Sequence, residues 1–177
     1  MGGERLGLSG MRMYADAHGL CGEYGALWDG ASDARSLFDL AMDVNGVRFL
    51  CDSYAGGWGL DVGYIQRRFG AYINGAYISE HVTGKGRGYT SELWCGVSDG
   101  RAVDCRCTLT LLLSCRVTFV VRAGMIRCLY VSCGSDVDLL CDGRADVYVG
   151  RGSRVVVRGD GDCRLHDGMT DFGSGIH

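Results

Sequence analysis

The sequence reads CTLTLLL from Cys107, VTFVV from Val117, CLYV from Cys128, VDLL from Val137, VYV from Val147, VVV from Val155 and CRL from Cys163. These seven segments start 10, 11, 9, 10, 8 and 8 residues apart. Each contains an apolar-x-apolar core, the two-residue period of a β-strand. Most connectors carry Gly or Asp, residues that favour tight turns. The C-terminal part of the chain is therefore predicted to form seven consecutive short strands.

Two architectures fit such a series of strands. Short strands at a spacing of about 8–12 residues are typical of sandwiches and barrels, whereas a fixed internal period is typical of a solenoid. The last four segments look alike, with Val or Cys recurring at the same place. We therefore favour a short parallel β-solenoid, with an antiparallel roll or meander as the alternative, because periodicity alone does not separate the two.

The N-terminal part has a different hydrophobic period. Between residues 11 and 75 apolar residues recur at spacings of three and four, which predicts short helices. The clearest begins at Ser32 or Asp33 as N-cap and ends at Asn45-Gly46. Segments 76–82 and 89–95 flank a Gly-rich turn and predict a hairpin. The expected fold class is α+β, with a helical part and linking hairpin over residues 10–95 and a β-repeat part over 96–170.

Composition limits the classes of protein to consider. The chain has 177 residues, 47% of them apolar and 22% charged, with a formal net charge of −3. These values are typical of a folded globular protein and argue against long disordered tracts. No stretch of 18 apolar residues is present, and the first ten residues lack the apolar region of a secretory signal. We expect a cytoplasmic protein without a membrane partner.

The ten cysteines raise the question of thiol or metal chemistry. Zinc sites need close ligand pairs, and only Cys105 and Cys107 are close, without any Cys-x-x-Cys. We interpret the cysteines as small buried apolar residues, with no metal and no cofactor. A thiol-dependent enzyme is the alternative. It lacks a matching base, because His166 lies three residues after Cys163 and would point to the opposite face of a strand, so no catalytic residue is nominated.

The stretch Gly159-Asp160-Gly161-Asp162 resembles the calcium-binding turns of nonapeptide β-rolls. The nonapeptide pattern occurs no more than once, however. We interpret the stretch as a plain tight turn.

Residues 47–72 have the outline of a helix-turn-helix around Gly56-Gly57-Trp58-Gly59. Its second helix would present the candidate nucleic-acid-binding residues Tyr64, Gln66, Arg67 and Arg68. Residues 1–100 carry 8 Lys or Arg against 12 Asp or Glu, a net charge of −4, which opposes binding to phosphates. We favour an α-hairpin that packs a small core, with DNA binding as the alternative.

Aromatic residues are concentrated between positions 58 and 94. Because Trp and Tyr are enriched in binding hot spots, we consider Trp58, Tyr77, Tyr89 and Trp94 a candidate partner surface. The alternative is that these side chains attach the helical part to the sheet.

Several segments together resemble small uncharacterised proteins of gut bacteria and their phages. The resemblance rests on Leu37–Ala41, Phe49–Cys51, Trp58–Leu60 and Phe69–Gly75, followed by short V-x-V repeats. It implies an intracellular accessory protein of phage or mobile-element type, with no activity to carry over. From the residues we expect a non-enzymatic binding protein with an unknown protein partner. Open ends of its β part would also allow homo-oligomers.

Overall fold

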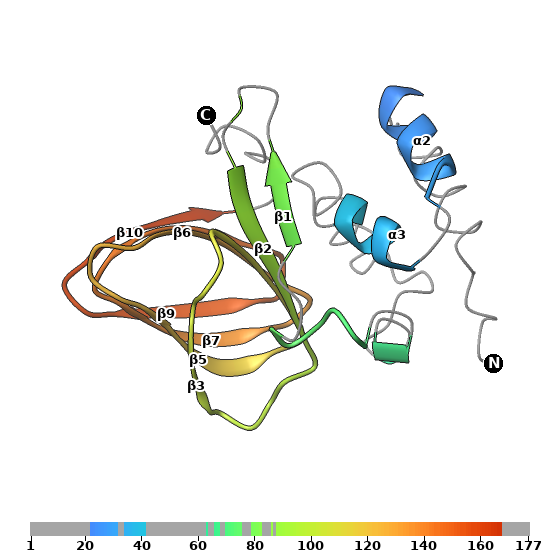
Figure 1. Ribbon diagram of the computed structural model, residues 1–177. Helices are drawn as coiled ribbons and strands as arrows, with labels where there is room; N and C mark the ends of the chain where they lie inside the picture. The colour runs from blue at the N-terminus through green and yellow to red at the C-terminus, as the bar shows by residue number, and fades with distance from the viewer. Residues whose placement is uncertain are drawn as a thin grey trace.

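The computed structural model describes residues 22–31, 34–41, 63, 66–67, 70–75, 79–82, 86 and 88–167. Residues 88–167 form a parallel β-solenoid, in which the chain coils through two facing sheets (Figure 1). Successive strands from β2 onward alternate between the two sheets, so each turn of the coil holds one strand of each. No helix within the described part of the chain is long and apolar enough to cross a membrane.

The larger sheet has six strands and the smaller has four. In order across the larger sheet these are β1 (Ser79–Val82), β2 (Gly88–Cys95), β4 (Leu109–Leu113), β6 (Ile126–Ser132), β8 (Arg144–Val149) and β10 (Asp162–Asp167). The smaller sheet contains β3 (Ala102–Asp104), β5 (Arg116–Val121), β7 (Asp136–Cys141) and β9 (Arg154–Arg158). All neighbours pair in parallel except β1 and β2.

The structure confirms the seven predicted strands, which are β4 to β10, and selects the solenoid over the antiparallel roll. The predicted spacing of 8–11 residues is half a coil, since Ser91 pairs with Leu109 and Ile126 with Arg144, offsets of 18 residues. The predicted hairpin is also present as β1 and β2. Its second strand has a further role that was not predicted, because β2 is the first strand of the coil.

Two short helices, α2 (Gly22–Asp29) and α3 (Ala34–Ala41), are described in the N-terminal region. Helix α3 lies within the helix predicted after Ser32 or Asp33. Most of the predicted helical part, including both candidate caps, lies outside the described residues.

The core fills the space between the two sheets. Side chains that point inward stack on their register partners in successive turns, as Leu112 does on Val131 and Phe119 on Leu139. Trp94, in the first turn, meets the Phe119 ring edge-on at 5.7 Å between centroids and 84° between planes. Parallel stacking therefore places like residues above like residues, which explains why each segment repeats the same apolar pattern.

The outer face of the larger sheet is also buried around its centre. All five residues of β4 are buried, so this strand is covered on both faces. Tyr130 and Tyr148 point outward from β6 and β8 and stack at 4.9 Å between centroids, and both are almost fully buried. The near-continuous apolar run of β4 is the pattern expected for a parallel strand inside a fold.

The N-terminal end of the coil is closed by backbone pairing. Strand β1 pairs with residues 88–91 of β2, and Ile73 bridges Leu93 further along the same strand. The Asn74 amide donates to the Leu93 carbonyl at 2.6 Å, and the Asn74 Oδ1 accepts from the Cys95 amide at 3.1 Å. The first strand of the larger sheet therefore has partners on both of its edges.

A buried carboxylate completes this closed end. Glu92 points into the first turn of the coil and has no exposed surface. Its Oε1 accepts hydrogen bonds from the amides of Arg106 and Cys107, both at 3.3 Å, and from the Thr110 hydroxyl at 3.2 Å. The Arg106 guanidinium donates to the Gly75 carbonyl at 2.8 Å, which joins the corner after β3 to the segment before β1. We assign Glu92 a structural role, because it satisfies donors of a tight corner.

Candidate functional site

The opposite end of the coil, made by β9 and β10, differs from the closed one. On one side β10 pairs with β8 and β9 pairs with β7. On the other side, no strand among residues 22–167 that the structure describes pairs with either of them. Figure 1 shows these two strands as the last of their sheets. We call β9, the turn 159–161 and β10 the open end.

The interior of the coil reaches solvent at the open end. Val157 and Leu165 are 36% and 51% exposed, although they occupy inward rows. Their register partners one turn earlier, Leu139 and Val147, are both fully buried. The open end therefore presents apolar side chains that a further turn or a partner would cover.

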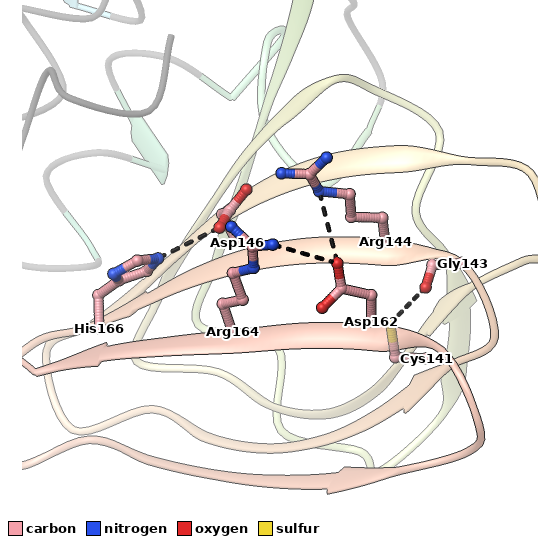
Figure 2. Close-up of polar contacts among 7 residues, drawn as sticks. All are labelled: Cys141, Gly143, Arg144, Asp146, Asp162, Arg164 and His166. Atoms are coloured by element: carbon pink, nitrogen blue, oxygen red, sulfur yellow. Dashed lines mark hydrogen bonds and ion pairs between the residues drawn. The ribbon is translucent and has the colours of Figure 1, made fainter.

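Charged side chains border this apolar patch. Asp162 lies between Arg144, at 3.8 Å, and Arg164, at 3.5 Å, as Figure 2 shows. On the other sheet, Arg158 lies 3.7 Å from Asp138. All of these side chains are about half exposed, so such pairs add little to stability. They leave charges of both signs at the rim of the patch.

His166 ends the aromatic stack on the outer face. Its ring stacks on Tyr148 at 4.6 Å and 15°, and its Nε2 lies 3.2 Å from Oδ1 of Asp146 (Figure 2). Cys163 points into the coil and packs against the core. The prediction that Cys163 and His166 face opposite sides is confirmed, so the two do not form a thiol–imidazole pair.

The Gly-Asp-Gly-Asp stretch is the tight turn between β9 and β10. The Gly161 amide donates to the Cys141 carbonyl and the Asp162 amide to the Gly143 carbonyl, both at 2.9 Å. Gly159 has a φ of 101°, and a Cβ atom there would lie 2.5 Å from the Cys141 oxygen. Close stacking on the preceding turn therefore explains these glycines. Within the described ranges no three His, Cys, Asp or Glu side chains gather as metal ligands.

Eight cysteines are described, and all are free thiols. Burial is the main cause that raises their pKa, to about 12 for Cys95, Cys105 and Cys128 and to about 11 for Cys163. A raised pKa keeps a thiol protonated and therefore unreactive. This agrees with the interpretation of these residues as small apolar side chains. Cys21 and Cys51 lie outside the described residues.

The raised thiol pKa values predict a loss of stability at high pH. Above pH 9 an unfolded chain loses thiol protons that the folded chain retains, so the unfolded state is favoured. The stabilising effect is complete below pH 9 and is lost as pH rises towards about 12. We expect the urea midpoint to fall between pH 8 and pH 10.5, roughly the range in which free thiols ionise. A Cys128→Ala variant should show a shallower fall, and an equally steep fall would contradict this explanation.

Few of the residues nominated from sequence lie in the described part. Tyr64 and Arg68 lie outside it, as do Trp58 and Tyr77. Gln66 and Arg67 are exposed, and the Gln66 amide donates a long hydrogen bond of 3.5 Å to the Cys95 carbonyl. This contact ties Gln66 to the solenoid.

The aromatic partner surface needs correction for the two members that are described. Trp94 is 5% exposed and lies inside the coil against Phe119, and Tyr89 is 9% exposed. The hairpin prediction gave β2 a solvent-facing side, whereas the coil buries this strand. Neither side chain offers a surface to a partner.

The residues of the open end were not nominated from sequence. Val157 and Leu165 look like any other inward apolar residues of the repeat, and only their position in the last turn exposes them. No family model, no curated protein and no solved structure matches this chain. The functional argument therefore depends on the geometry of the open end.

Proposed function

We propose that this chain is a non-enzymatic binding protein whose partner adds to the open end of the solenoid. One observation carries the proposal, namely the difference between the two ends. At the first turn β2 has β1 and Ile73 on its outer edge, whereas at the last turn Val157 and Leu165 are exposed.

Sheet edges are suited to binding by strand addition. An added strand gains main-chain hydrogen bonds, and alternate side chains supply specificity. Here the added strand would also cover apolar side chains, since inward residues of β9 and β10 reach solvent. Unprotected edges promote uncontrolled association, and proteins commonly cover them.

Enzymatic alternatives receive less support from the site. The described thiols have raised pKa values, which disfavours a thiolate nucleophile. DNA binding through Tyr64 to Arg68 remains a prediction. So does the resemblance to proteins of phages and mobile elements.

Photo-crosslinking tests the proposal in the cells that produce the protein. We expect benzoylphenylalanine in place of Leu165 to give a discrete adduct, because that side chain lies in the proposed contact. Ile126 is a matched control, since it is 61% exposed against 51% for Leu165 but lies outside the open end. Absence of an adduct at Leu165, or equal adducts at both positions, would contradict the proposal.

A further inference from the structure

We propose that the partner at the open end is a second copy of this chain, related by a two-fold axis parallel to the strands. Each copy would add its β9 to the β10 of the other, in antiparallel pairing. The inference rests on the proposed function and adds to it the identity of the partner. Three features support it, which are the register, the apolar complementarity and the charges.

The register follows from the turn that joins the two strands. Val156 lies four residues before Asp160, and Arg164 lies four residues after it. Two extended strands that leave one turn in opposite directions therefore hold Val156 and Arg164 at the same level. A two-fold axis parallel to the strands preserves the level of every residue. It thus places Arg164 opposite Val156 of the second copy.

This register joins the two apolar interiors. Directly opposed residues of an antiparallel pair point to the same face. Leu165 then lies opposite Val155 of the second copy, and Cys163 lies opposite Val157. All four residues belong to inward rows, and Leu165 and Val157 are among the most exposed apolar side chains described. Each copy would therefore close the interior of the other.

The same register brings opposite charges together. Asp162 lies opposite Arg158 of the second copy, and the two-fold axis produces this pair twice. His166 lies opposite Arg154, but each has its own carboxylate nearby, Asp146 at 3.2 Å and Asp136 at 2.9 Å. The pairing therefore leaves no cation at the junction without a carboxylate.

The rise of the coil excludes the other two-fold arrangement. One turn advances by about 4.8 Å, the strand spacing, so β10 stands about half a spacing beyond β9. An axis perpendicular to the strands that pairs β10 with β10 would leave the two β9 strands about two spacings apart. It would also place Arg158 opposite Arg154 of the second copy. Pairing β9 with β10 closes both sheets at once.

Light scattering after size-exclusion chromatography of the full chain, under reducing conditions, tests the inference. We expect a dimer. Asp162→Arg and Arg158→Asp alone would each oppose like charges twice and raise the dissociation constant at least about tenfold, whereas the double variant would restore it. Arg122→Asp is the matched control, because Arg122 is in an exposed ion pair, with Asp104 at 2.8 Å, away from the open end.

Cross-linking tests the register itself. Val157→Cys should form a disulfide with Cys163 of the second copy when oxidised glutathione accepts the two electrons and two protons. A covalent dimer on a non-reducing gel is expected. Val156→Cys is the control, since position 156 faces outward opposite Arg164. A covalent dimer from Leu165→Cys but not from Val157→Cys would indicate β10-to-β10 pairing and overturn the inference.

The outcomes separate this inference from the proposed function. A chain that is monomeric up to about 0.1 mM, or a double variant that fails to restore the dimer, overturns the second copy as partner. If the Leu165 adduct then contains a different protein, the proposed function stands alone. If there is neither dimer nor adduct, both fail.

Discussion

Replacing Phe119 by Ala is expected to lower the free energy of unfolding by about 3–5 kcal/mol. Phe119 has no exposed surface, packs against Trp94 and stacks on Leu139 in the next turn. Loss of the ring removes apolar contacts and leaves a cavity that a coil, fixed on both sides by strand pairing, cannot readily close. Urea unfolding followed by circular dichroism measures the change.

Two further variants make this test specific. Phe119→Leu fills most of the cavity and should cost less than about 1.5 kcal/mol. Ile126→Ala removes an apolar side chain that is 61% exposed and should cost less than about 1 kcal/mol. Equal losses for Phe119→Ala and Ile126→Ala would mean that the interior of the coil is not the main source of stability.

A second large effect is expected at Gly143, in the turn between β7 and β8. A Cβ atom there would overlap the Arg122 carbonyl oxygen and lie 2.6 Å from that of Met125. Both obstacles are backbone atoms of the preceding turn, so relief requires the coils to separate. We expect Gly143→Ala to lower the free energy of unfolding by about 3 kcal/mol or more.

Gly134 provides the matched control because it separates crowding from backbone strain. It has a φ of 73°, but a Cβ atom there would meet nothing within 4 Å. Gly134→Ala should therefore cost only about 1–2 kcal/mol, the penalty for a left-handed conformation. If Gly134→Ala were the more damaging of the two, close stacking of turns would not be the reason for Gly143.

The strands could be predicted from sequence, but their direction could not. Alternating apolar residues and Gly or Asp connectors define short strands in either arrangement. A further signal lies in the charges, since Asp104 pairs with Arg122 and Asp136 with Arg154, both 18 residues apart. Opposite charges at one fixed offset are expected when strands stack in parallel register, and this offset equals the length of one coil.

The candidate site was harder to predict because its residues are ordinary. Val157 and Leu165 have the same pattern as the buried Leu139 and Val147, and only the end of the coil makes them accessible. Trp94 shows the opposite case. An aromatic residue in a hairpin seemed available to a partner, but pairing of β2 with β4 makes that hairpin strand part of the coil and places the ring inside.

The closed N-terminal end has a consequence for the size of any assembly. A coil with two open ends could add copies indefinitely and grow into a filament, as cross-β structures do. In this chain β1 and Ile73 already occupy the outer edge of β2, so growth has no second site from which to continue. Polymerisation by strand pairing would therefore terminate after a single addition.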